Sequence, residues 1–211
     1  MTVLIETIRV QQGTAPLWPL HAARLRAASG TLGIRLPHVE APEGGTDRVV
    51  RIAAGAGSVS FSVRDAAIPD SISLHVTSHA HAAYPWKTED RLVFDLAHDE
   101  AVHVGADDAL LLTGEGLVAE ASRWALVWRQ PGGAIAAPPL ALGVLRSVAR
   151  ERLSQLLAGR LVEARVRLDG ILGCPAAVLN AARGIVAVAA IDGQAVPPWD
   201  GWAALRARFW S

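Results

Sequence analysis

Residues 84–92 read Tyr-Pro-Trp-Lys-Thr-Glu-Asp-Arg-Leu, and the lysine of this stretch, Lys87, is the only one in the chain. The other 19 of the 20 Lys and Arg residues are arginine. Arginine cannot replace a lysine whose function requires a neutral amine, because the guanidinium group stays charged. An amine with a lowered pKa can form a Schiff base with an aldehyde cofactor. Alternatively, an arginine-rich composition has retained one lysine by chance, and the count alone leaves both interpretations open.

The bulk composition narrows the class of protein. A chain of 211 residues is long enough for one large domain or two small ones. The sequence has no run of 18 apolar residues and no signal-peptide pattern, so we expect no membrane span and no export signal. A net charge of zero with scattered arginines argues against binding nucleic acid. The lone cysteine, Cys174, rules out an internal disulfide and predicts a cytoplasmic protein.

Hydrophobic periodicity predicts an N-terminal α+β domain over residues 1–79 and a linker over residues 80–86. A helix is expected from Pro19 to about Leu32, where apolar residues recur at helical spacing. The apolar stretches of this half predict four strands, over residues 3–10, 49–53, 59–63 and 72–77.

A C-terminal α/β domain is expected over residues 87–211. Its first helix is predicted to run from directly after Lys87 to about Val102, and two more are predicted over residues 145–157 and 198–209. Apolar runs between the helices predict strands over residues 108–113, 117–121, 124–129, 134–136, 161–166 and 185–191.

Six segments together resemble the class IV aminotransferase family of pyridoxal-phosphate enzymes. That family includes branched-chain aminotransferases, D-amino-acid aminotransferases and aminodeoxychorismate lyases. The matching segments, in the family's order, are 4–10 (LIETIRV), 21–25 (HAARL), 87–95 (KTEDRLVFD), 108–122 (DALLLTGEGLVAEAS), 138–150 (PPLALGVLRSVAR) and 180–188 (NAARGIVAV). The resemblance implies the two-domain α/β (α+β) architecture called fold type IV, with pyridoxal 5'-phosphate in the interdomain cleft. It also implies a homodimer.

The resemblance implies roles for two residues in the chemistry. Lys87 would bond to the cofactor and act as the general acid and base that moves the proton. Glu120 would lie against the pyridine nitrogen and keep it protonated, so that the ring can act as an electron sink. Without the family resemblance, the local sequence favours a solvent-facing strand residue at Glu120.

The cofactor phosphate needs charged and amide donors. The resemblance implies Arg24, the backbone amides of Val148 and Ala149 at a helix start, and a second loop made by Asn180, Ala181 and Ala182. From the residues alone, Arg24 could be a surface arginine of an amphipathic helix. The chain also departs from the family pattern, with Arg146-Ser147 where the family has Pro-Gly and Ala125 where it has Asn.

Two arginines are candidates for a substrate carboxylate. Arg91 stands four residues after Lys87, so a helix would place both on one face. It could equally be structural, paired with Asp95. Arg183 is a second candidate, with an exposed loop arginine as its alternative. Four histidines, at 79, 81, 98 and 103, lack the carboxylate or cysteine pattern that would complete a metal site, so no metal is expected.

Three functions follow from the resemblance. The first is a lyase that converts 4-amino-4-deoxychorismate to 4-aminobenzoate and pyruvate for folate biosynthesis. The Lys-x-x-x-Arg-Leu spacing that begins at Lys87 and the Asn-Ala start of the 180–182 loop favour it. The second is an aminotransferase of branched-chain or D-amino acids. The third is a homologue that binds the cofactor or a ligand without turnover.

Overall fold

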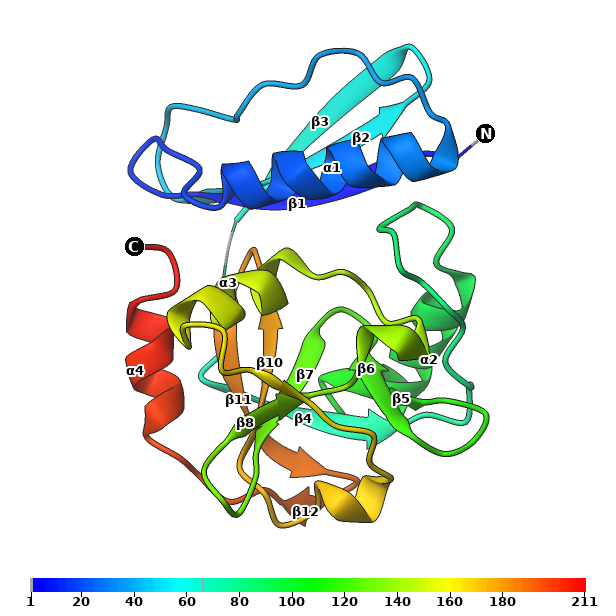
Figure 1. The fold of residues 1–211 in the computed structure, drawn as a ribbon, viewed down its shortest axis with the longest axis vertical. Helices are drawn as coiled ribbons and strands as arrows, with labels where there is room; N and C mark the ends of the chain where they lie inside the picture. Colours follow the sequence, from blue (N-terminus) through cyan, green and yellow to red (C-terminus); the bar gives the residue numbers. More distant parts are fainter. Residues whose placement is uncertain (1, 66) are drawn as a thin grey trace.

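Two separate sheets organise the chain in this computed structural model, which describes residues 2–65 and 67–211. The smaller sheet has three strands in the order β1-β2-β3, and the larger has nine strands. Figure 1 shows the smaller sheet, with α1 running along it, above the larger one. The α+β fold class expected from the sequence is confirmed.

The N-terminal unit is an antiparallel sheet covered on one side by a helix. Its strands are β1 (Leu4–Val10), β2 (Arg48–Gly55) and β3 (Ser58–Arg64). The helix α1 (Trp18–Leu32) has a proline in its first turn and ends at Gly33, whose φ of 66° is the left-handed cap that glycine favours. Its buried residues His21, Leu25 and Ala28 recur at helical spacing and face the sheet.

The larger sheet is mixed and its central strands are buried. Its strands run in the order β6-β5-β4-β11-β10-β7-β8-β9, with β12 beside β11. Strands β4 and β5 are parallel, as are β4 and β11. Its strands are β4 (Ser71–Val76), β5 (Asp108–Leu112), β6 (Val118–Ala121), β7 (Ala125–Arg129), β8 (Ile135–Ala137), β9 (Val162–Glu163), β10 (Ala176–Asn180), β11 (Gly184–Ile191) and β12 (Gln194–Ala195).

Three helices complete this unit: α2 (Leu92–His103), α3 (Val148–Leu156) and α4 (Gly201–Ala207). Short 3-10 turns stand at Leu140–Leu142 (η1) and Leu168–Gly170 (η2). Apolar clusters cover both faces of the sheet: Trp128 and Val178 belong to one, and Leu153, Leu179 and Phe209 to the other. Burial on both faces explains why β5 and β10 are nearly continuous apolar runs.

Several element boundaries differ from the sequence predictions. The helix expected directly after Lys87 begins only at Leu92, because the residues between them pair with another strand and the cap residue Arg91 has a non-helical φ of −134°. Helix α3 begins at Val148 rather than at residue 145, because Ser147 caps it by accepting a hydrogen bond from Arg150 N. The strand expected over residues 161–166 is only β9, two residues long.

Strand β4 lies before the expected domain boundary in the sequence, but it belongs to the sheet of the C-terminal unit. That boundary, at residues 80–86, leaves residues 72–77 in the N-terminal unit. In the structure β4 pairs with β5 and β11 of the larger sheet. A strand's own pattern does not say which sheet it joins, so the sequence could not place β4. We propose that the chain passes between the two units after β3 and before β4.

Candidate active site

A cavity of about 350 Å³ contains all of the site residues expected from the sequence. Strand β1 and helix α1 of the N-terminal unit contribute to its wall, as do β6, α3 and the β10–β11 turn of the larger unit. The expected residues that line it are Arg24, Lys87, Arg91, Glu120, Val148, Ala149, Asn180, Ala181, Ala182 and Arg183.

Lys87 lies in an extended segment that pairs with the free edge of β1. Ile5 N donates to Lys87 O at 2.8 Å, and Glu89 N donates to Val3 O at 3.0 Å. The hydroxyl of Tyr84 accepts a hydrogen bond from Thr88 N at 2.7 Å. Lys87 is therefore held by strand-like pairing, and it does not share a helix face with Arg91 as the sequence suggested.

The Lys87 amine is prepared for proton transfer by its surroundings. It is partly accessible through the cavity, although protein surrounds it closely. Burial lowers the pKa of Lys87 from 10.5 to about 7, and the positive charges of Arg24 and Arg91 act in the same direction. Glu6 and Glu120 oppose this effect. A large fraction of the amine is therefore neutral near pH 7, as a general base requires.

Glu120 is a buried carboxylate that two neighbours orient. It lies on β6 with 5 % of its surface exposed. Its Oε1 contacts His81 Nε2 at 3.0 Å and accepts a hydrogen bond from Leu145 N at 3.0 Å. Both contacts use Oε1, so Oε2 is the oxygen available to a ligand nitrogen. The solvent-facing alternative for Glu120 is wrong.

The start of α3 presents backbone amides to the cavity. Ser147, Val148 and Ala149 line it, and the first N–H groups of a helix have no intrahelical acceptor. The helix dipole makes such a terminus attractive to an anion. The Ser147 side chain is occupied by capping Arg150 N, so the chain reaches this geometry without the Pro-Gly turn of the family pattern.

The β10–β11 turn is shaped by the side chain of Asn180. Its Oδ1 accepts hydrogen bonds from Ala182 N at 3.1 Å and Arg183 N at 2.8 Å. Those two amides are therefore engaged within the turn. Ala181 N is the candidate amide donor of this turn.

Arg24 is held by the buried carboxylate of Glu6, which His21 also contacts, and the sequence prediction gave neither residue a role. Glu6 Oε1 accepts from Arg24 Nε at 2.9 Å, and Glu6 Oε2 accepts from Arg24 Nη2 at 2.5 Å. His21 Nδ1 lies 2.6 Å from the same Oε2. A charged residue in the middle of an otherwise buried strand was the signal that could have revealed Glu6. The side-chain positions correct the alternative that Arg24 is a surface arginine.

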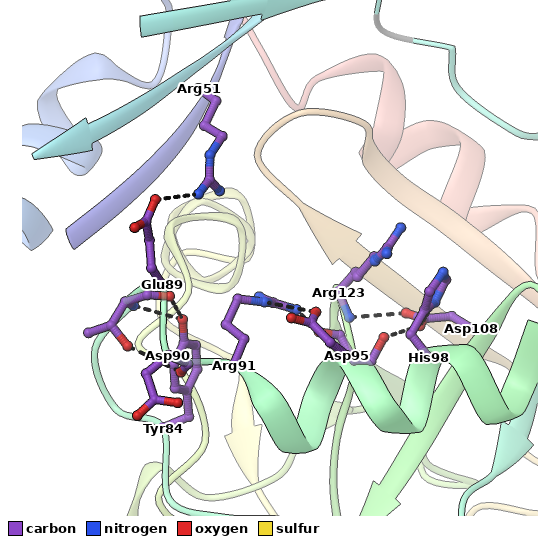
Figure 2. A network of polar contacts seen from close by, with 11 residues as sticks. Arg51, Tyr84, Glu89, Asp90, Arg91, Asp95, His98, Asp108 and Arg123 are labelled. Carbon is purple, nitrogen blue, oxygen red and sulfur yellow. Dashed lines mark hydrogen bonds and ion pairs between the residues drawn. The ribbon is translucent and has the colours of Figure 1, made fainter. Parts of the chain in front are cut away.

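Further arginines lie around the cavity. Arg91 donates from Nη2 to Ser122 O at 2.8 Å and lies 3.5 Å from Asp95, so its structural pairing and its place in the cavity coexist. Figure 2 shows Arg51 reaching from the small sheet to Glu89, and Arg91 and Arg123 on the larger unit. Burial lowers the pKa of Arg183, and the positive charges of Arg64 and Arg123 lower it further.

Residues 48–191 match the sequence profile described as amino-transferase class IV. The chain belongs to the class IV aminotransferase family. Class IV aminotransferases use pyridoxal 5'-phosphate, and the protein is a pyridoxal-phosphate-dependent enzyme of this family, either an aminotransferase or a lyase. A comparison with curated protein sequences gave no match.

Solved structures of class IV enzymes share the fold. A branched-chain aminotransferase from Thermoproteus uzoniensis has a TM-score of 0.84 at 18% identity, over 99% of this chain and 84% of that one. A protein assigned as a 4-amino-4-deoxychorismate lyase from Legionella pneumophila has a TM-score of 0.83 at 20% identity, over 98% and 91%. A branched-chain aminotransferase from T.th., complexed with N-(5'-phosphopyridoxyl)-L-glutamate, has a TM-score of 0.80 at 22% identity, over 99% and 83%. The expected fold type IV is confirmed.

The donor set around the cavity fits the class IV cofactor. It offers a single amine with a lowered pKa, an oriented buried carboxylate, and a helix start beside a guanidinium group. These are the groups needed to bind an aldehyde, a pyridine nitrogen and a phosphate. We propose that Lys87, Glu120 and Arg24 fill these roles, with the amides of Val148, Ala149 and Ala181.

The described residues offer neither a metal site nor a helix that could span a membrane. Among residues 2–65 and 67–211, no group of three or more His, Cys, Asp or Glu side chains is arranged to hold a metal ion. Three of the four candidate histidines have a carboxylate neighbour: His79 lies near Glu100, His81 contacts Glu120 and His98 contacts Asp108. In the same described ranges, no helix combines the length and the apolar character needed to span a membrane.

Proposed function

We propose that the protein is a pyridoxal-phosphate-dependent lyase that converts 4-amino-4-deoxychorismate to 4-aminobenzoate and pyruvate. The observation that carries this proposal is the charge of the cavity. Three carboxylates line it, against Lys87 and six arginines: Arg24, Arg51, Arg64, Arg91, Arg123 and Arg183. A substrate with two carboxylates fits this excess of positive charge, whereas a branched aliphatic side chain would leave it unmatched.

Three of these arginines, Arg64, Arg123 and Arg183, form a group at the cavity wall. They come from three separate segments. Burial lowers the pKa of Arg183, and the charges of Arg64 and Arg123 lower it further, while Asp108 opposes them. Arg183 also lies over the ring of Trp124, 5.7 Å from its centroid. A cyclic dicarboxylate has a flat apolar body for such a surface and two anionic groups for the guanidinium forks. We propose that these arginines bind the substrate's carboxylates.

The reaction removes one proton from the ring and breaks the bond between the ring and the enolpyruvyl oxygen. Bound pyridoxal phosphate supplies an electron sink for this step. Lys87 removes the ring proton from the carbon that bears the amino group, since its pKa of about 7 leaves part of the amine neutral at pH 7. The released enolpyruvate becomes pyruvate by gaining a proton, and Lys87 can supply that proton. Glu120, which His81 and Leu145 N orient, would lie toward the ring nitrogen of the cofactor.

The test is to incubate the cofactor-loaded protein with 4-amino-4-deoxychorismate and to follow 4-aminobenzoate by fluorescence. We expect product from the wild type and none from Lys87→Ala. Arg123→Gln should raise KM about tenfold or more, through loss of a charged hydrogen bond. Arg160→Gln, which changes an exposed arginine outside the cavity, is the matched control and should leave KM unchanged.

Three results of this assay would point away from a lyase or identify another function. A wild-type protein that shows the visible absorbance of bound cofactor but forms no 4-aminobenzoate contradicts the lyase proposal. If the same protein converts its cofactor to the amine form with a branched-chain or D-amino acid, it is an aminotransferase. If it does neither with a broad set of amino donors, it binds the cofactor without turnover.

We also propose that the enzyme is a cytoplasmic homodimer. Family membership supports the dimer, as do Phe61 and Val63, which expose more than half of their surface on the edge strand β3. The free thiol of Cys174 suits a reducing compartment. Light scattering on the purified protein tests the dimer, and a mass of one chain at micromolar concentration would contradict it.

A further inference from the structure

The buried charges beside the cavity form one connected cluster. Glu6 is 2 % exposed and His21 is fully buried. The carboxylate of Glu6 accepts hydrogen bonds from both Nε and Nη2 of Arg24, and it lies 2.6 Å from His21 Nδ1. An ionised carboxylate can only accept hydrogen bonds, so His21 donates from Nδ1. Burial lowers the pKa of His21, although the charge of Glu6 opposes this, and a neutral imidazole then leaves Nε2 without a proton.

This cluster is poorly explained by stability alone. Charges taken out of water carry a desolvation cost that a salt bridge does not reliably recover, and apolar side chains of similar size often serve as well. His21 adds a further cost, because its Nε2 is buried with no hydrogen-bond partner among the described residues. A strand and a helix that needed only to pack would not require this arrangement, so a role toward the neighbouring cavity is the better explanation.

The contacts fix Arg24 and still leave it donors. Nε and Nη2 are bonded to Glu6, and Nη1 donates to Arg146 O at 3.2 Å. A guanidinium group has five N–H bonds, so one on each Nη remains for a ligand. Since Arg24 lines the cavity, those donors belong to a side chain whose orientation is already fixed by contacts on its other edge.

The same carboxylate acts on Lys87. Two positive groups, Arg24 and Arg91, face the amine and lower its pKa, whereas the carboxylates of Glu6 and Glu120 raise it. The pKa of Glu6 itself is lowered to about 2: burial opposes this, but Arg24 and His21 together outweigh it. Glu6 is therefore ionised throughout the physiological range. It is a fixed negative charge on β1, the strand with which the Lys87 segment pairs.

We propose that Glu6, supported by His21, is a positioning residue that holds Arg24 toward the cofactor phosphate and places a buried negative charge on the strand that pairs with the Lys87 segment. It touches neither substrate nor cofactor. The inference rests on the proposed cofactor roles of Lys87 and Arg24, and it is independent of whether the enzyme is a lyase or an aminotransferase.

The first measurement uses the single lysine. Reductive ¹³C-methylation of the cofactor-free protein labels Lys87 and the N-terminal amine, so the Lys87 pKa can be followed by NMR. In Glu6→Gln a negative charge is lost, and we expect the Lys87 pKa to fall below its wild-type value. Glu6→Asp keeps the charge and should restore it. Asp108→Asn removes an equally buried carboxylate, one that does not act on Lys87, and should leave this pKa unchanged.

The second measurement isolates the phosphate. Pyridoxal and pyridoxal 5'-phosphate carry the same aldehyde, so the ratio of their dissociation constants reports the phosphate contacts alone. We expect Glu6→Gln to reduce the preference for the phosphate form about 10- to 100-fold, because Arg24 loses its fixed orientation. His21→Gln leaves the charges of Glu6 and Arg24 in place, so it should reduce the preference for the phosphate form less.

Two results would overturn the proposal. One is a folded Glu6→Gln protein with a wild-type Lys87 pKa, and the other is an unchanged preference for the phosphate form. If Glu6→Gln does not fold, His21→Gln decides, since an unchanged phosphate preference in that variant contradicts the positioning role. None of these measurements uses a substrate, so a failed lyase assay leaves them interpretable.

Discussion

A lysine buried beside two arginines should make the cofactor-free protein less stable at low pH. The pKa of Lys87 is about 7 in the folded chain, against 10.5 for a free side chain. Between these values the unfolded chain binds more protons, so the free energy of unfolding falls as the pH drops from 10.5 to 7. At about 1.36 kcal/mol for each pKa unit, the full effect is at most about 5 kcal/mol. Contact with water in the cavity reduces it.

The perturbation is Lys87→Met, which keeps a long side chain and removes the amine. We expect the cofactor-free variant to be more stable than the wild type below pH 7, by a few kcal/mol. The difference should shrink as the pH rises and reach a constant value above 10.5. Urea unfolding from pH 6 to 11, in steps of half a pH unit, measures it. The shape of the difference matters, because methionine adds a constant packing contribution.

A flat difference across this range would refute the reasoning. It would mean that Lys87 titrates like an exposed amine, and that neither burial nor the two arginines acts on it as the structure indicates. Asp108→Asn, measured at the same pH values, controls for a general effect of changing a buried charge. The same flat result would also remove the basis for Lys87 as a general base near pH 7.

Three further predictions concern other parts of the molecule. Glu120→Ala should lower kcat about 100-fold or more, measured by product fluorescence, because the ring nitrogen loses its fixed charge; an unchanged kcat would exclude that role. Asn180→Ala should weaken cofactor binding about tenfold in an absorbance titration, because the turn loses two hydrogen bonds. The pKa of Glu100 is lowered to about 2 by its hydrogen bonds to Thr77 and Ser78, so the wild type should lose stability between pH 4.5 and 2. Glu100→Gln should not lose this stability in acid unfolding. If the stability of the variant and of the wild type fell in parallel with pH, the prediction would be contradicted.

The sequence predicted most of the helices and strands, and the residues it selected for the site line the cavity. Strand periodicity located β1 and β2, and helical spacing located α1, because each carries a clear apolar face. The family resemblance then placed residues as distant as Arg24 and Arg183 together, which no local pattern could do. Both line the cavity in the structure.

The sequence failed where distant partners decide the local structure. The stretch after Lys87 has helix-forming residues, but it pairs with β1, some 80 positions earlier, and the helix starts only at Leu92. Strand β4 joins a sheet whose other members come later in the chain. The use of the Asn180 side chain within its own turn likewise depends on the folded backbone, so the engagement of Ala182 N could not be anticipated.

The pairing of the Lys87 segment with β1 has a mechanical consequence. Lys87 is attached by its backbone to the small sheet, whereas Glu120 and the start of α3 belong to the large one. The neighbouring Tyr84 and Pro85 bond to Gly143 and Arg146 of the large unit, so the segment joins the two units. A rotation that kept the pairing with β1 would move the amine relative to the carboxylate. A ligand that contacts both Lys87 and Glu120 would hold the two units in one relative orientation. The distance between these two side chains would then report how far the units open or close.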